Sequence, residues 1–226
     1  MGRRWIPCLA VVASILTAGC AARSSSLTAA DYQERAGSVK KIGIVLVGTG
    51  VRHLHAGGET SPDAESAAKC ASCAAEAVEL ALAYRGYGAF GLPLDRSYLT
   101  LLAEYRQVRD ELFNASPADG RTLPGITPLA GAPALCAKNA VDAIVIVGAC
   151  DNHFPEGGRT VFWDQALLRV YFGRGVAYAD LSAVDCTGRI LHYSQRSGSY
   201  CTLSDEDGVH KVFGELVSGL PEAGRQ

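Results

Sequence analysis

The sequence predicts an α/β fold: a mixed sheet with parallel core strands, helices packed on it, and a C-terminal antiparallel hairpin followed by a final helix. Residues 40–48 and 141–148 are continuous β-branched apolar runs, typical of strands buried on both faces. Helical patterns between the early strands imply that the core strands are parallel. Residues 176–185 and 189–197 alternate around a glycine turn, which predicts the hairpin.

Helix signals supply the other elements. Ser61-Pro62-Asp63 predicts the start of an Ala-rich helix, with a capping hydroxyl and proline at the first helical position. This helix should continue to Tyr84-Arg85 and stop at Gly86. We then expect a short strand, an amphipathic helix, a short helix and, from a capping box of Ser204 and Asp207, a last helix. Their expected ranges are 87–92, 97–113, 132–138 and, for the last helix, from residue 204 to about 220.

The outward and inward faces of these helices can be assigned from the same pattern. The amphipathic helix should turn Leu101, Leu102, Tyr105, Val108 and Leu112 to one side. Four tyrosines are predicted to serve core or rim packing, namely Tyr84, Tyr87, Tyr98 and Tyr105. Arg106 and Arg109 are predicted to lie on a solvated helix face.

The first segment has the features of an export signal. Two arginines precede an apolar run that is too short to span a bilayer, and Leu16-Thr17-Ala18-Gly19-Cys20 follows. Small residues before a cysteine resemble the lipobox of bacterial lipoproteins, in which the cysteine thiol is acylated. The alternative is an ordinary cleaved signal, with Cys20 incidental. Because no aspartate follows Cys20, analogy with known lipoproteins favours the outer membrane, with the protein on its periplasmic face.

Composition excludes several classes of protein. The chain has 226 residues, 48% hydrophobic and 19% charged, which fits neither a disordered chain nor a coiled coil. Its net charge is −2, and it becomes −4 once Arg3 and Arg4 leave with the signal. A nucleic-acid-binding protein would need a basic face, so no nucleic-acid partner is expected.

The order of elements resembles one group of envelope proteins. The shared features are a buried strand, a helix that ends in Arg85-Gly86-Tyr87, the run 139–148, and the hairpin 179–192. The group comprises envelope lipoproteins like the curli-secretion lipoprotein, the penicillin-binding-protein activator lipoprotein and the N-terminal domain of the Tol translocation protein. The resemblance covers residues 40–220 and transfers no catalytic residue. The pore-forming helices of curli secretion are not recognisable, so no channel is implied.

Six cysteines remain after Cys8 and Cys20, and an even number in an oxidising compartment predicts disulfides. Cys136 and Cys150 flank one strand and lie about 30 Å apart, so they cannot pair. The topology predicts Cys136 with Cys186 at one end of the sheet and Cys150 with Cys201 at the other. Cys70 and Cys73 would pair locally or exchange with the second group. A redox site is disfavoured because about twenty residues separate this CxxC from the preceding strand.

One set of side chains could hold a metal. His53 and His55 follow the first core strand, and Asp151 and His153 follow the strand 141–148. Loops that follow neighbouring parallel strands leave the same edge of a sheet, where ligands bind. Three imidazoles and a carboxylate could bind zinc with an open position for water. The alternative is that these are exposed polar loop residues, and we expect no cofactor.

These observations predict a signal peptide (1–19), a lipidated flexible tether (20–39), one periplasmic domain (40–220) and a tail (221–226). We expect a palmitate-bearing outer-membrane lipoprotein that binds or assembles envelope proteins without catalysis, attached to the membrane through its lipid. A homo-oligomer is left open. The alternative function is a metal-binding protein or small metal-dependent hydrolase that uses His53, His55, Asp151 and His153.

Overall fold

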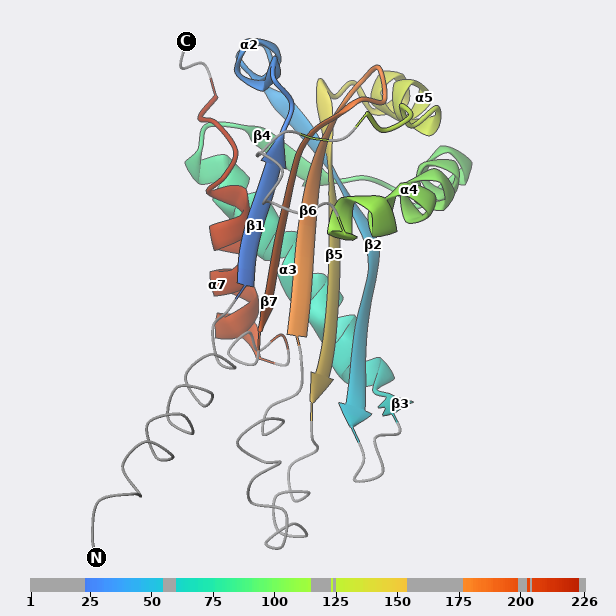
Figure 1. Ribbon diagram of the computed structural model, residues 1–226, viewed down its shortest axis with the longest axis vertical. Helices are drawn as coiled ribbons and strands as arrows, with labels where there is room; N and C mark the ends of the chain where they lie inside the picture. The colour runs from blue at the N-terminus through green and yellow to red at the C-terminus, as the bar shows by residue number, and fades with distance from the viewer. Residues whose placement is uncertain are drawn as a thin grey trace, which may run out of the picture.

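The computed structural model describes residues 23–54, 60–114, 123, 125–153, 177–198, 203 and 205–223. These residues form a seven-stranded sheet in the order β1-β7-β6-β5-β2-β3, with β4 also paired to β2 (Figure 1). β2 runs parallel to β4 and β5, and the other pairs are antiparallel. The predicted fold class is confirmed. The strands are β1 (Arg23–Thr28), β2 (Lys41–Leu54), β3 (Thr60–Pro62), β4 (Gly88–Gly91), β5 (Ala143–His153), β6 (Ala177–Asp185) and β7 (Ile190–Gly198).

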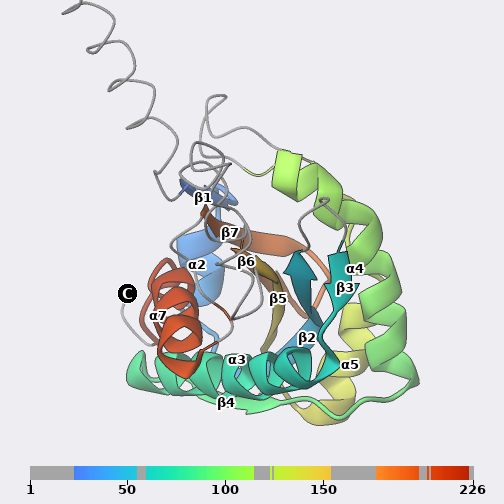
Figure 2. The same ribbon diagram turned by 90° about the horizontal axis from the view of Figure 1, so that it is seen from below.

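Helices cover both faces of the sheet, which gives three layers (Figure 2). One face packs against α3 (Ala64–Tyr84) and α7 (Glu206–Val217), and the other against α4 (Arg96–Asn114) and α5 (Gly131–Asn139). We call these the α7 face and the α4 face. The short α2 (Tyr32–Ala36) joins the core of the α7 face. None of the described helices is long and apolar enough to cross a membrane.

Two helix starts differ from the expected caps. Asp63, rather than Ser61, caps α3, because its carboxylate accepts the N–H of Ser66 at 3.0 Å. Ser61 and Pro62 instead belong to β3, which pairs with the end of β2. Asp205 caps α7 by accepting the N–H of Gly208 at 2.7 Å, while Ser204 lies outside the described residues. In both cases an aspartate at the N-cap position provides the acceptor that the first turn needs.

The part of the expected flexible tether that the structure describes is folded. From Arg23 onward the supposed tether forms β1, which pairs with β7 along its whole length, and α2, whose Tyr32 and Ala36 are buried. Pairing with β7 satisfies the backbone groups of alternate residues in this serine-rich segment, and Leu27 is buried, so the segment folds. At the other terminus, Ala223 donates its N–H to the Arg85 carbonyl at 2.9 Å.

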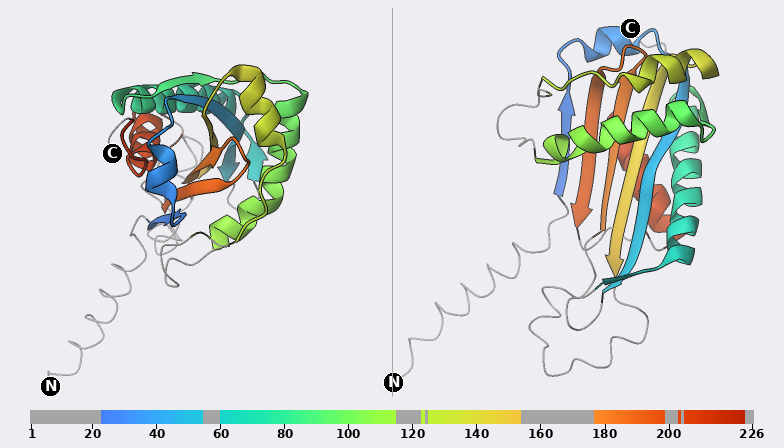
Figure 3. Two further views of the ribbon diagram at one scale, coloured as in Figure 1. Left: turned by 90° about the horizontal axis from the view of Figure 1, so that it is seen from above. Right: turned by 90° about the vertical axis from the view of Figure 1, so that its right-hand side faces the viewer.

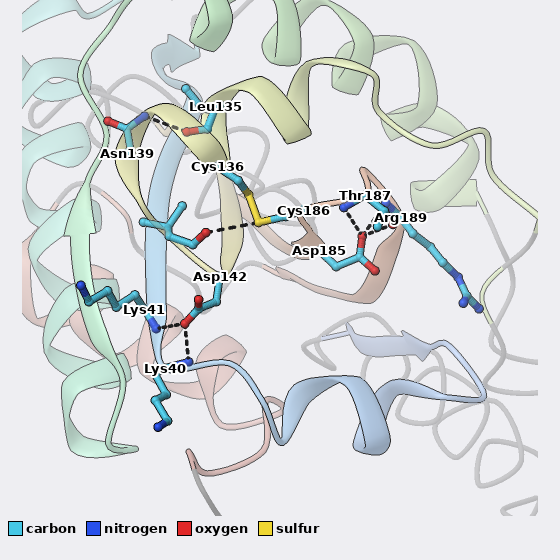
Figure 4. Close-up of a disulfide and its surroundings, with 11 residues drawn as sticks. Lys40, Lys41, Leu135, Cys136, Asn139, Asp142, Asp185, Cys186, Thr187 and Arg189 are labelled. Atoms are coloured by element: carbon cyan, nitrogen blue, oxygen red, sulfur yellow. Dashed lines mark hydrogen bonds between the residues drawn. A yellow bond between two sulfur atoms is a disulfide. The ribbon is translucent and has the colours of Figure 1, made fainter.

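The cysteines Cys136 and Cys186 form the predicted disulfide, with Cα atoms 5.7 Å apart (Figure 4). It ties the end of α5 to the turn between β6 and β7. That turn is held by Asp185, whose carboxylate accepts the N–H groups of Thr187 and Arg189 at 2.9 and 3.1 Å. The cross-link therefore joins two elements that are already ordered by local hydrogen bonds.

The two ends of the described chain lie at opposite ends of the sheet (Figure 3). Arg23 begins β1 opposite Ser197, near the end of the sheet at which β2 and β5 finish. We call this the carboxyl end. Ala223 lies against Arg85, close to the start of β2, at the other end.

Candidate functional site

The carboxyl end brings together the two strands that the metal hypothesis requires. β2 and β5 are parallel neighbours, and the Cα atoms of His53 and His153 are register partners. The expected adjacency of the two strands is therefore confirmed, and His53 and His153 are the last paired residues of this register. His55 and the side chain of His153 lie outside the described residues.

Two of the predicted metal ligands make contacts within the fold. His53 Nε2 lies 3.2 Å from a carboxylate oxygen of Asp63, the residue that caps α3. Asp151 is buried, and its carboxylate accepts the backbone N–H of Leu203 at 2.9 Å. Among the described residues, no group of three or more His, Cys, Asp or Glu side chains is placed to hold a metal ion. These two contacts position α3 and the segment before α7.

The three other described cysteines are free thiols, so Cys70 and Cys73 do not form the local disulfide that was one of the two options. Burial, with smaller effects of Asp151 and the other thiols, raises the pKa of Cys70 to about 11. A protonated thiol is a poor nucleophile, so Cys70 is not activated for redox chemistry. Cys150 lies on the α4 face, since its neighbour Ala149 packs into the opposite core. Cys201 lies outside the described residues.

A buried polar cluster on the α4 face was not anticipated from the sequence. Asp180 of β6 is fully buried, and Arg109 of α4 donates to both of its carboxylate oxygens. The hydroxyl of Tyr105 donates to Asp180 at 3.1 Å and lies 2.8 Å from the hydroxyl of Ser182. Burial and the nearby charge of Asp180 raise the pKa of Tyr105 well above its usual value, which keeps this donor protonated.

The geometry around this cluster explains why Arg109 is not a solvated surface residue. Its guanidinium lies 5.1 Å from the ring centroid of Tyr178, and Phe113 packs edge-on against the same ring at 5.5 Å. Gly148 of β5 leaves the space, because a Cβ there would lie 2.3 Å from Arg109. The predicted solvated position of Arg109 is therefore wrong, and the pairing with Asp180 is the physical reason. Arg106 is exposed, although its guanidinium also donates to the Val47 carbonyl.

Large apolar side chains are exposed around β4. Among the described residues, five of the six large apolar side chains that are exposed fall between residues 80 and 99, before, on and after this strand. Tyr84 is 91% exposed, Leu94 73% and Leu99 55%, so Tyr84 does not serve the core packing that was expected. Single exposed apolar residues are ordinary, and a contiguous apolar patch marks an interaction site. These five lie on α3, on β4 and on the segment that leads from β4 into α4. We call Leu80, Tyr84, Phe90, Leu94 and Leu99 the β4-flanking residues.

Comparison with known proteins does not assign this chain to a family. No protein-family model matches the sequence, and no curated protein is significantly similar to it. Among solved structures, the chain is 10% identical to the PelC dodecamer from Paraburkholderia phytofirmans, with a TM-score of 0.45 over 91% of this chain and 100% of that chain. A single-substitution variant of the same dodecamer gives 10% identity and a TM-score of 0.39 over 90% and 99% of the two chains. Neither TM-score reaches 0.5, so neither similarity establishes a shared function.

Proposed function

We propose that this protein is an outer-membrane lipoprotein, acylated at Cys20, whose periplasmic domain binds or assembles envelope proteins without catalysing a reaction. The exposed β4-flanking residues carry the binding part of this proposal. They present apolar surface that a protein partner would cover. The resemblance of the sequence to the curli-secretion, penicillin-binding-protein activator and Tol group supports the same role.

The chemistry of the buried polar groups supports a binding role over a catalytic one. Asp180 pairs with Arg109, and Asp151 accepts a backbone N–H, so each of these carboxylates stabilises a neighbouring element. The Cys136–Cys186 disulfide supports export, because structural disulfides form and persist in oxidising compartments such as the periplasm.

Acylation is tested by Cys20→Ser in the full chain. We expect the variant to leave the membrane fraction or to accumulate as uncut precursor, and to lose label from a radioactive fatty acid. A variant that still fractionates with outer membrane and still carries acyl label would exclude Cys20 as the attachment site. Cys70→Ser is the control, because it removes a buried thiol elsewhere in the chain.

Binding is tested by charge substitutions at the β4-flanking residues. Leu94→Glu and Leu99→Glu place a carboxylate in surface that a partner should desolvate, whereas Gln107→Glu places the same charge on an exposed position of α4. Chemical cross-linking in detergent-solubilised envelopes, followed by purification and mass spectrometry, should recover a stoichiometric partner. The first two changes should reduce its yield at least about tenfold, and the third should not. Equal yields from all three variants would exclude this surface.

A further inference from the structure

The strand β1 forms an open edge of the sheet. It stands at one end of the strand order and pairs with β7 from Arg23 to Thr28. No other strand in the described part of the chain pairs with it (Figure 3). An edge of this kind presents backbone donors and acceptors to any chain that approaches it.

The hydrogen-bond pattern shows which residues of β1 face outward. Ala29 donates its N–H to the Leu191 carbonyl at 2.8 Å, which fixes the alternation along this antiparallel pair. It follows that Ser24, Ser26 and Thr28 direct their N–H and C=O groups away from β7. The Thr28 carbonyl confirms this, since it accepts the N–H of Leu123 at 3.3 Å. One of the outward carbonyl groups of β1, that of Thr28, therefore already accepts a hydrogen bond.

Within the described part of the chain, Ser24 and Ser26 lack the features that normally protect a strand edge. Natural edges are blunted by charged side chains, by proline, by bulges or by a covering segment. The run Ser24-Ser25-Ser26 contains neither charge nor proline, its pairing with β7 is continuous, and the side chains of Ser24 and Ser26 are exposed. Their small side chains would also not obstruct a neighbouring strand.

A polar groove lies beside this edge on the α7 face. Its volume is about 170 Å³, and its wall is formed by β1, β7 and the end of α7. Ser24, Ser26, Ser194 and Ser218 contribute to its lining, and Arg196 and Glu215 form an ion pair within it. The side chains of a strand added beside β1 would alternate, so that one row would lie over this groove.

We propose that the β1 edge is a binding site for an extended segment of a partner protein, which adds to the sheet as an eighth strand. Backbone hydrogen bonds to Ser24 and Ser26 supply the affinity, and the groove selects small or polar side chains on one side of the added strand. This inference rests on the proposed function, in which the domain binds an envelope protein.

A second copy of this chain fits the edge less well. If two β1 strands paired with each other in antiparallel fashion about Ser25, their starting residues would point in opposite directions. Cys20 lies three residues before β1, so the two acylated cysteines would leave the paired strands at opposite ends. Both anchors would reach one membrane only if the paired strands lay along its surface. A segment of a different protein is free of this constraint.

The experiment uses the full-length protein in its own envelope, with a photo-cross-linking amino acid, p-benzoylphenylalanine, in place of Ser24. Ser26→Pro removes an outward N–H and leaves the hydrogen bonds between β1 and β7 intact, whereas Ser26→Thr keeps that N–H. The adduct with the partner should fall at least about tenfold with Ser26→Pro and persist with Ser26→Thr. An adduct that survives Ser26→Pro would overturn the proposal. So would an adduct formed with a second copy of this chain or within the chain itself.

A second probe in place of Leu94 separates this inference from the proposed function. An adduct at Leu94 without one at Ser24 would refute the strand addition and leave the binding module standing, while no adduct at either position would refute both. Thermal unfolding and the Leu94 adduct report whether Ser26→Pro is folded. If Ser26→Pro is not folded, the positions are exchanged: the probe replaces Ser26, and Ser24→Pro is compared with Ser24→Thr. Loss of the adduct in Ser24→Pro alone supports the proposal, and an adduct that survives Ser24→Pro overturns it.

Discussion

Two buried polar side chains on opposite faces of the sheet, Asp180 and His192, are accommodated in different ways. On the α4 face, the buried carboxylate of Asp180 is held by the guanidinium of Arg109. On the α7 face, His192 is 2% exposed, and its Nδ1 lies 3.2 Å from the Thr28 hydroxyl. Its Nε2 has no hydrogen-bond partner among the described residues. Asp180 is stabilised as a charge by its pairing with Arg109, whereas His192 is buried as a neutral ring, so the first site should be sensitive to mutation and the second to pH.

The largest expected effect comes from breaking the charged pair. Asp180→Asn leaves the Arg109 guanidinium without its counter-ion, and the free energy of unfolding should fall by about 3 kcal/mol. Urea unfolding followed by circular dichroism measures the change. Glu111→Gln, an exposed position on the same helix, should change stability by less than about 0.5 kcal/mol. The double variant Arg109→Met with Asp180→Leu should recover much of the loss, and a small effect of Asp180→Asn would show that the pair does not hold α4.

The disulfide should have the next largest effect, because it fastens α5 to the sheet on the α4 face. Replacing both Cys136 and Cys186 by serine should lower the free energy of unfolding by about 2–4 kcal/mol, since the cross-link closes a long loop in the unfolded chain. A reductant should lower the unfolding temperature of the unchanged protein and leave the double variant unaffected. Insensitivity of the unchanged protein to reductant would contradict a stabilising cross-link.

His192 should make stability depend on pH. Burial lowers the pKa of His192 to about 4, from an ordinary value of 6.5. Its ring contacts are the Thr28 hydroxyl, the stacked ring of Tyr32 and the backbone near Gly219, none of them charged at neutral pH. The unfolded chain therefore takes up a proton below pH 6.5 while the folded chain does not.

The resulting loss of stability is about 2–3 kcal/mol between pH 6.5 and pH 4, and it vanishes about one pH unit above 6.5. Urea unfolding at a series of pH values should show this slope. His192→Gln should remove the slope, and His210→Gln should retain it. A slope that persists in His192→Gln would assign the acid sensitivity to other groups.

The smallest effect is expected at the carboxyl end. His53 already contacts Asp63, and Asp151 already accepts the Leu203 N–H, so neither is freely available as a ligand. Protein purified without added metal should contain less than about 0.2 zinc per chain by elemental analysis. A value near one, abolished by His53→Ala and by His153→Ala, would favour the alternative of a metal-binding protein.

The pattern of apolar residues in the sequence predicted most of this fold. The apolar runs at β2 and β5, the alternation at β6 and β7, and the periodicity of α4 each arise from the local sequence. The Cys136–Cys186 disulfide followed from the topology alone, because it requires only that one end of the sheet be shared. Such features depend on residues that are near in sequence or on the order of elements.

What the sequence did not reveal depends on contacts between distant residues. Ser24-Ser25-Ser26 has no strand signal of its own, and it becomes a strand because β7 offers a partner. Arg109 and Asp180 lie 71 residues apart, so neither side chain alone indicates that the other neutralises it. A signal was present in hindsight, since Arg109 follows Tyr105 by one helical turn on the apolar side of α4, and Asp180 interrupts an apolar strand.

The placement of the two chain ends has a consequence for how far the protein reaches. β5 has 11 residues, and at about 3.3 Å per residue the sheet spans roughly 35 Å from its carboxyl end to the end where Ala223 lies. With Cys20 in the membrane as proposed, only three residues precede the first strand, and these span about 10 Å when fully extended. The folded domain would then be a rigid spacer joined to the membrane by a short linker. The length of the sheet and of these residues would set the greatest height of its C-terminal end above the lipid, and a fluorophore attached to the C-terminus could measure that height by energy transfer.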